Sequence, residues 1–141
     1  HNIYYRFSRD GIHWGSPERC VNDNGNDPFL DFGYTNWHFS CKPNYRKKKI
    51  EFLSYARPIS QEGEGGLFYA ECDMDSLSLI RTPIIEPLLL PSENNWDDGN
   101  LYRACFCTTG NENTYYRIWY SAVSRKGVWK LGYTGGYISD L

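Results

Sequence analysis

Short aromatic and apolar runs, alternating with polar residues at a spacing of two, recur along the whole 141-residue chain. Such alternation, bounded by clusters of Gly, Pro, Asn and Asp, predicts β-strands joined by turns rather than helices. Loops are predicted at residues 22–31, 61–66 and 91–99. The predicted strands cover residues 4–8, 12–14, 37–42, 49–57, 66–72, 78–81, 101–108, 115–123 and 128–134. The pattern therefore predicts an all-β fold.

Two consecutive predicted strands form a unit that repeats after roughly sixty residues. Residues 49–56 and 66–73 match residues 115–122 and 127–134, and residues 3–10 match the second strand of each pair. Repeated sets of short antiparallel strands are typical of β-propellers, in which each blade buries its faces against its neighbours. A β-sandwich uses similar strands but does not predict the same ordered set twice.

This repeat predicts one partial propeller domain over residues 1–141, made of about two and a half four-stranded antiparallel blades. Residues 1–21 would end a preceding blade, residues 32–90 would form one blade, and residues 96–141 the next. Two sheet edges would then be exposed, and an exposed edge is a template for pairing with another strand. We therefore expect missing blades of the same protein, or another chain, as partners at these edges.

The overall charge and hydropathy exclude two classes of partner. A net charge of −2 argues against a nucleic-acid-binding surface, which is normally basic. The basic cluster at residues 46–49 is interpreted as a solvated hairpin turn. No apolar stretch reaches the length of a membrane-spanning helix, so no membrane partner is predicted. The aromatic content of 17% instead suits surfaces that are apolar on one side and wet on the other.

The cysteines favour a reducing compartment over a metal centre. There are five, an odd number, with no Cys-x-x-Cys pair, and the three histidines are scattered. Zinc would need further ligands near Cys105 and Cys107, so no metal site is predicted. Cysteines in apolar strand surroundings behave as small buried hydrophobes. Reduced thiols modestly favour a cytoplasmic location.

The segment from Ser8 to Trp14 is the sharpest local motif. Asp10 and Gly11 predict a hairpin turn, because Asp bonds neighbouring backbone amides and Gly adopts positive φ. Trp14 would then pack between sheets, which makes the motif structural.

Four segments together resemble a known group of proteins: Ser-x-Asp-Gly-Ile-x-Trp at residues 8–14, and residues 96–103, 116–122 and 127–134. They are similar to the later blades of five-bladed β-propellers related to glycoside hydrolases of families 32, 43 and 68, including bacterial glycosidase-like propellers. The resemblance covers essentially the whole chain. It implies a carbohydrate-active protein, with catalytic carboxylates at the inner ends of the innermost strands around a central funnel.

The carboxylate motifs of those enzymes are not found here. The chain has no Trp-Met-Asn-Asp-Pro-Asn-Gly and no Arg-Asp-Pro, and Asn26-Asp27-Pro28 is only a fragment of such a string. Glu71-Cys72 resembles a Glu-Cys acid motif, but the repeat assigns it to a third strand away from the funnel. Glu71 is therefore interpreted as part of the blade.

The candidate site follows from the repeat order, which makes residues 37–42 and 101–107 the innermost strands. Asp31 and either Asp97 or Asp98 are the carboxylates that could flank a glycosidic bond, with Asp31 and Asp97 as the predicted catalytic pair; hydrolysis requires two carboxylates about 5–10 Å apart. Aromatic rings stack on sugar C–H groups, and Asp, Arg and His bond hydroxyls. The predicted substrate-binding residues at the entry ends of these strands are Trp37, His38, Trp96, Asp98, Tyr102 and Arg103.

Other interpretations of the same residues stay open. The scaffold could serve as a non-catalytic glycan-binding or assembly module, because fold does not fix function. The aspartates could also cap turns, with Arg103 pairing with one of them. Calcium is suggested by the oxygen ligands of Asp97 and Asp98, although their spacing matches no Ca²⁺ loop.

Overall fold

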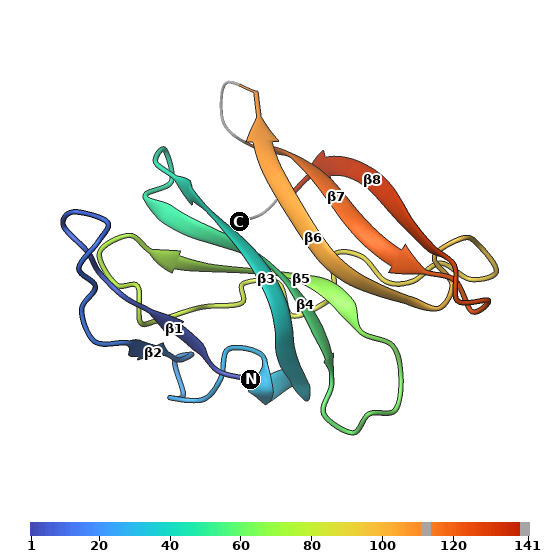
Figure 1. The fold of residues 1–141 in the computed structure, drawn as a ribbon, viewed down its shortest axis with the longest axis horizontal. Coiled ribbons are helices and arrows are strands. Elements are labelled where there is room, and N and C mark those ends of the chain that lie inside the picture. Colours follow the sequence, from blue (N-terminus) through green and yellow to red (C-terminus); the bar gives the residue numbers. More distant parts are fainter. Residues whose placement is uncertain (111–113, 139–141) are drawn as a thin grey trace.

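The computed structural model describes residues 1–110 and 114–138, which form three small antiparallel sheets (Figure 1). The all-β prediction is confirmed. One 3₁₀ turn, η1 (Leu30–Phe32), precedes the long strands. The strands are β1 (Ile3–Tyr5), β2 (Glu18–Cys20), β3 (Tyr34–Asn44), β4 (Lys49–Pro58), β5 (Gly66–Asp73), β6 (Asn100–Thr109), β7 (Tyr115–Val123) and β8 (Trp129–Tyr137).

The two larger sheets have the same topology, which is the structural counterpart of the sequence repeat. Strands β3, β4 and β5 form the middle sheet, β6, β7 and β8 form the last sheet, and each is a simple antiparallel meander. Ala56 pairs with Asn36 and Ala122 pairs with Leu101, so Ala56 and Ala122 occupy the same place in their sheets. Each sheet is blade-like.

The expected fourth strand of the middle sheet is reduced to short contacts. Arg81 exchanges two backbone hydrogen bonds with Glu71 on the outer edge of β5. The Leu67 N–H donates to the Leu89 carbonyl, and the Leu67 carbonyl accepts from the Leu88 N–H. The segment between Arg81 and Leu88 contains prolines at positions 83 and 87, which lack the N–H that a continuous ladder needs. The strand predicted at residues 78–81 is therefore present only as isolated bridges.

The N-terminal motif forms the predicted turn but not the predicted packing. Asp10 Oδ1 accepts hydrogen bonds from the backbone N–H groups of Ile12 and His13 at 2.9 and 2.8 Å, and Gly11 has φ +76°. The prediction that Trp14 packs between sheets is wrong, because the residue is 57% exposed. Its backbone instead closes the turn by pairing with Ser8.

Strand β4 lies at the centre of the middle sheet and is buried on both faces. On one face Phe52 and Ala56, with Phe68 and Ala70 of β5, pack against the N-terminal segment. On the other face Leu53 and Tyr55, with Leu67 and Tyr69, pack against β6 and β7 of the last sheet. Successive strand residues point to opposite faces, so the unbroken run of buried residues in β4, from Glu51 to Ala56, fills both interfaces.

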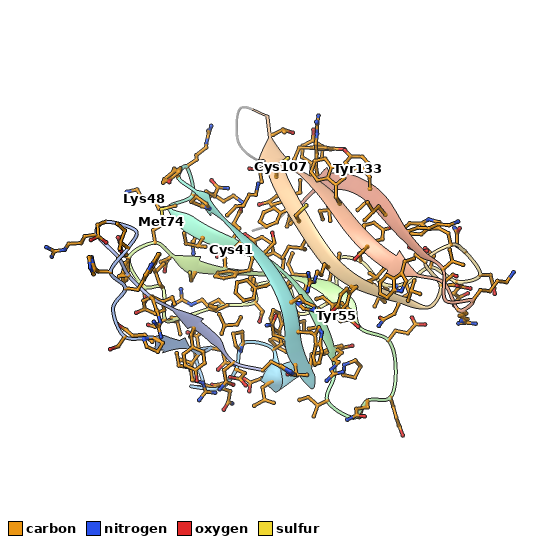
Figure 2. The ribbon with its side chains drawn as sticks, viewed as in Figure 1. Cys41, Lys48, Tyr55, Met74, Cys107 and Tyr133 are labelled. Carbon is orange, nitrogen blue, oxygen red and sulfur yellow. The ribbon has the colours of Figure 1, made fainter. Side chains whose placement is uncertain are left out.

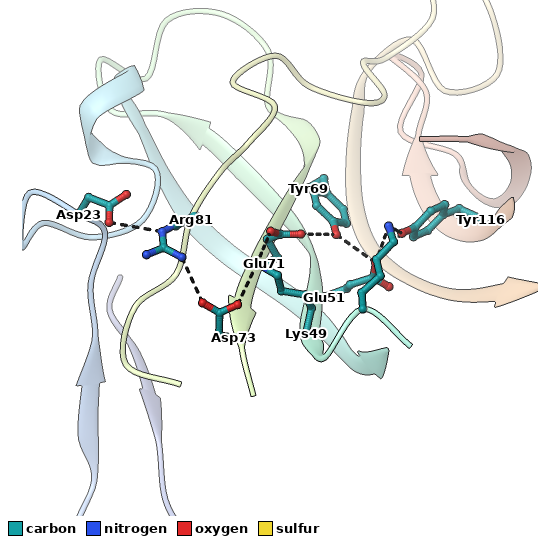
Figure 3. Close-up of polar contacts among 9 residues, drawn as sticks. Asp23, Lys49, Glu51, Tyr69, Glu71, Asp73, Arg81 and Tyr116 are labelled. Atoms are coloured by element: carbon teal, nitrogen blue, oxygen red, sulfur yellow. Dashed lines mark hydrogen bonds and ion pairs between the residues drawn. The ribbon is translucent and has the colours of Figure 1, made fainter. Parts of the chain in front are cut away.

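A buried carboxylate joins the middle and last sheets (Figure 3). Glu51 of β4 is 1% exposed. Its Oε1 accepts a 2.5 Å hydrogen bond from Tyr116 Oη of β7 and a 3.1 Å bond from Tyr69 Oη of β5, and Lys47 Nζ lies 3.6 Å away. Burial first, then the neighbouring carboxylate, raises the pKa of both tyrosines, so both keep their protons as donors.

The same chain of polar contacts continues along the outer edge of β5. Glu71 lies 3.0 Å from Tyr69 Oη, whose single proton it shares with Glu51, and it pairs with Lys49 at 2.9 Å. Lys49 also pairs with Asp73, and Arg81 bonds Asp73 at 3.3 Å, which ties the short fourth-strand segment to the sheet. Glu71 therefore lies on a third strand and within a structural network (Figure 3).

The five cysteines are free thiols and divide by location. Cys20 and Cys72 are buried in the interface with the N-terminal segment, and burial raises the pKa of each thiol to about 11. Cys41 and Cys105 are exposed, and Cys107 is half-buried (Figure 2 labels Cys41 and Cys107). The expectation that the cysteines pack as small hydrophobes thus holds for Cys20 and Cys72.

Removal of one hydroxyl from the buried network tests its contribution to stability. Tyr116→Phe deletes the shortest donor to Glu51 and leaves the carboxylate under-bonded. We expect a loss of about 1–3 kcal/mol in the free energy of unfolding. Urea denaturation followed by tryptophan fluorescence measures it. Tyr115→Phe, on the opposite face of β7, is the control, and an equal loss in both variants would contradict the assignment.

Candidate functional site

Two equivalent irregularities place the candidate site at the entry ends of β3 and β6. The register of β3 against β4 shifts between Asn36 and His38, so Trp37 is extra. The register of β6 against β7 shifts between Leu101 and Ala104, which leaves Tyr102 and Arg103 unpaired. A β-bulge bends its strand and redirects the inserted side chain. The two bulges turn side chains from separate sheets toward each other.

Aromatic rings cross the gap between the two sheets at these bulges. The ring centroids of His38 and Tyr102 are 4.6 Å apart in an edge-to-face arrangement. Tyr102 also contacts Trp129 at 5.7 Å, and Trp37 contacts His38 at 6.1 Å. The contacts run from Trp37 in β3 to Trp129 in β8 without interruption. We call these four residues the bulge cluster.

Two guanidinium groups accompany the bulge cluster. The Arg57 guanidinium lies 3.9 Å from the centroid of Trp37, which is close cation–π geometry. Arg103 lies beside Tyr102 and is exposed. Burial, helped by the charge of Arg103, lowers the pKa of His38, so the imidazole is neutral at pH 7. The Nε2 atom of His38 is shielded from solvent and has no hydrogen-bond partner among the described residues.

A small polar pocket of about 220 Å³ opens next to the bulge cluster. Tyr55, Arg57 and Asn100 line it, together with the 61–65 loop. Tyr55 Oη donates a 2.9 Å hydrogen bond to Asn100 Oδ1, and Tyr55 also contacts Tyr102. A Cβ on Gly65 would meet the Tyr55 hydroxyl well inside van der Waals contact, so only glycine lets the loop approach this ring.

The sequence-based prediction missed Tyr55, Arg57 and Asn100. The sequence feature that could have identified them is their position at the end of β4 and the start of β6, because these positions flank the bulged segments. A bulge cannot be read from an alternating pattern until the register is known.

Four of the predicted residues come together and four do not. Trp37, His38, Tyr102 and Arg103 gather at the bulges, and their role in substrate binding stays a prediction. Asp31 lies in η1 and accepts hydrogen bonds from the side-chain amides of Asn22, Asn24 and Asn26 at 2.7–2.8 Å. These amides, with those of Asn24 and Asn26 contributing most, lower the pKa of Asp31. It is therefore an anion at neutral pH.

Asp97 and its neighbours precede β6 of the last sheet, whereas Asp31 lies in η1. Asp97 is 1% exposed and accepts a 3.2 Å hydrogen bond from Tyr120 Oη, while its second oxygen has no partner among the described residues. Trp96 stacks on Tyr120 at 5.7 Å and covers Gly132, where a Cβ would lie 2.6 Å from the indole. The pairing of Asp31 with Asp97 in catalysis stays a prediction.

The Asp98 carboxylate is engaged at a turn. It accepts a 2.8 Å hydrogen bond from the Arg125 backbone N–H, and it shares a hollow of about 400 Å³ with Trp96 and Lys130. Asp97 and Asp98 thus have separate hydrogen-bond partners, and calcium binding by this pair stays a prediction. Among residues 1–110 and 114–138, no group of three or more His, Cys, Asp or Glu side chains is arranged to hold a metal ion. Within the same ranges, no helix has the length and hydropathy to span a membrane.

Comparison with known proteins identifies a shared fold. No protein-family model matches the chain, and no curated protein matches it. One solved structure that it resembles is that of an N-acetylgalactosamine deacetylase from F. plautii in complex with blood group B trisaccharide. The TM-score is 0.75, the identity is 21%, and the match covers 97% of this chain and 42% of the deacetylase chain. The likeness establishes the fold alone.

The asparagine cradle around Asp31 yields a test of its ionisation. Asn24→Ala combined with Asn26→Ala removes the two largest causes of the lowered pKa, so the pKa of Asp31 should rise toward its ordinary value. A carboxyl group with a lowered folded pKa stabilises the fold above its unfolded pKa, and this stability is lost as pH falls through the folded pKa. The double variant should therefore lose less stability on acidification.

Carbon-detected NMR titration of the side-chain carboxyl groups measures this shift. Asp73 is an internal control, because its pKa is lowered chiefly by Lys49 and should not move. An unchanged Asp31 pKa in the double variant would show that the amides do not hold the anion.

Proposed function

We propose that this chain is a carbohydrate-binding β-propeller-type domain that contacts its glycan with the bulge cluster. The observation that carries the proposal is the convergence of the two bulges, which brings His38 within 4.6 Å of Tyr102. Trp37, His38, Tyr102 and Trp129 offer ring faces and edges, and Arg57 and Arg103 offer planar donor groups. Sugars present C–H patches and hydroxyls that match these two kinds of contact.

The structural neighbour supports a glycan as the ligand class. That protein is a deacetylase of N-acetylgalactosamine whose structure holds a blood group B trisaccharide. The stacking of sheet faces in this chain is also what successive propeller blades require. Because the chain matches 42% of the length of that neighbour, its enzymatic activity is not transferred to this chain.

Binding is favoured over hydrolysis by the chemistry of the bulge cluster. The contacts that define it come from aromatic, imidazole and guanidinium groups, whereas Asp31 lies in its asparagine cradle and Asp97 is buried beneath Tyr120. Hydrolysis needs two carboxylates across one bond. A glycoside hydrolase-like activity that uses Asp31 and Asp97 is the alternative function.

Calorimetric titration with blood group B trisaccharide, and with a panel of neutral and acidic oligosaccharides, tests the binding site. Tyr102→Leu keeps an apolar residue but removes the ring, so affinity should fall by about tenfold, or about 1.4 kcal/mol. Tyr45→Leu is the matched control, because Tyr45 is 77% exposed on the β3–β4 turn. A wild-type protein that binds no member of the panel, or equal losses in both variants, would refute the proposal.

Carboxylate variants distinguish the alternative function, glycoside hydrolysis, from glycan binding. Asp31→Asn should leave glycan affinity within about twofold of wild type, because the carboxylate lies outside the bulge cluster. Release of reducing ends from the same oligosaccharides reports hydrolysis. Hydrolysis by the wild type that is abolished in Asp31→Asn and in Asp97→Asn would establish the alternative, provided that both variants unfold at the wild-type denaturant concentration.

A further inference from the structure

The small polar pocket beside the bulge cluster contains a cation that no carboxylate neutralises. Arg57 lines this pocket of about 220 Å³ and is half-buried. Arg19 of β2, in contrast, pairs with Asp27 at 2.7 Å. Among the described residues, no carboxylate pairs with Arg57, and its guanidinium packs on the face of Trp37. The N–H groups of Arg57 are therefore available to a ligand.

The stacking of Arg57 on an indole prepares it to bind an anion. The guanidinium carbon lies 3.9 Å from the centroid of Trp37, which holds the side chain at the pocket. A guanidinium presents paired N–H donors in one plane, and these match the two oxygens of a carboxylate. Because the stack already restricts Arg57, less rotational freedom is lost when an anion binds. Arg57 is thus suited to anchor a carboxylate.

Other groups at the site add donors and a second positive charge. Tyr55 Oη donates to Asn100 Oδ1, which leaves the N–H groups of the Asn100 amide as donors. Arg103 is exposed on β6, and no carboxylate among the described residues pairs with it. Burial first, then the charge of Arg103, lowers the pKa of His38, so the field of Arg103 reaches the bulge cluster. The neutral imidazole supplies no further charge.

One carboxylate lines the pocket, on the 61–65 loop. Glu64 is exposed, and no ion pair joins it to Arg57. The predicted catalytic residues Asp31 and Asp97 have their partners elsewhere, in the asparagine cradle and at Tyr120. Two arginines therefore face one glutamate at this site, although the whole chain has a net charge of −2. Such a local excess of positive charge favours an anionic ligand.

We propose that the ligand of the bulge cluster is an acidic glycan, in which the carboxylate of a uronic or sialic acid unit binds Arg57 in the small pocket. This inference rests on the proposed glycan-binding function. The pocket is smaller than the roughly 300 Å³ at which sites for whole small molecules begin, so it suits one sugar unit or its acidic group. The rings of the bulge cluster then contact the C–H groups of the neighbouring units.

Calorimetric titration with acidic sugars and their methyl esters tests the charge of the ligand directly. The probes are trigalacturonic acid and sialyllactose, because esterification removes the negative charge and keeps the sugar rings. The wild type should bind at least one acid about tenfold more tightly than its ester, since the ester cannot accept charge-assisted hydrogen bonds as a carboxylate does. This preference should shrink as the salt concentration rises.

Charge-removing variants assign the preference to Arg57. Arg57→Gln should lower the affinity for the acid to that of its ester, whereas Glu64→Gln should raise it about twofold, because a like charge is removed. Arg6→Gln is the matched control, since Arg6 is exposed in the N-terminal segment, and it should bind as the wild type does. Circular dichroism and the unfolding midpoint check each variant. Glu64 is exposed, so its variant still tests the charge if Arg57→Gln does not fold.

The possible results separate this inference from the proposed function. Equal affinity for acid and ester in both pairs would overturn the inference and leave glycan binding intact. An unchanged preference in a folded Arg57→Gln protein, or a weaker one in Glu64→Gln, would do the same. A wild type that binds no acid, no ester and no neutral oligosaccharide would refute the proposed function as well.

Discussion

The contact between the middle and last sheets is the constraint on which the rest of the structure depends. Leu53, Tyr55, Leu67 and Tyr69 give this interface its apolar area, and Glu51 with its tyrosine donors fixes the lateral position of one sheet on the other. A buried carboxylate is costly unless its lone pairs are bonded, so the sheets cannot slide without leaving it unpaired. The spacing of β3 from β6, and hence of the two bulges, follows from this contact.

The candidate site is therefore a product of the interface rather than of either sheet alone. His38 and Tyr102 belong to different sheets and meet because β3 and β6 lie side by side (Figure 1). Tyr55 takes part in both the interface and the candidate site. Its ring packs in the interface, while its hydroxyl bonds Asn100 at the mouth of the small pocket. The packing of the interface and the geometry of the candidate site are coupled through this one side chain.

The alternating pattern predicted the long strands β3 to β8, whereas residues 12–14 and 78–81 form only isolated bridges. The repeat predicted that β3 and β6 are equivalent strands of their sheets. That is why the amino-acid sequence alone could place Trp37, His38, Tyr102 and Arg103 together. The pattern could not predict the positions of Asp97 and Trp96. Asp97 is bonded by Tyr120, and Trp96 packs over Gly132, which has no side chain to block the indole. It also could not show the cradle around Asp31, which depends on three loop amides folding back on η1. The packing predicted for Trp14 was wrong for a related reason, since its partner surface is not set by local spacing.

The burial of both faces of β4 also has a consequence for the rates at which different strands open locally. Local opening of a strand exposes the surface that its neighbours cover, so its free energy rises with the number of packed faces. The amide protons of β4 should then exchange with solvent only when the whole molecule unfolds, whereas those on the outer edge of β8 should exchange through small fluctuations. The rate of amide exchange should therefore increase from β4 toward β8. The candidate site, which lies between these strands, should exchange at intermediate rates.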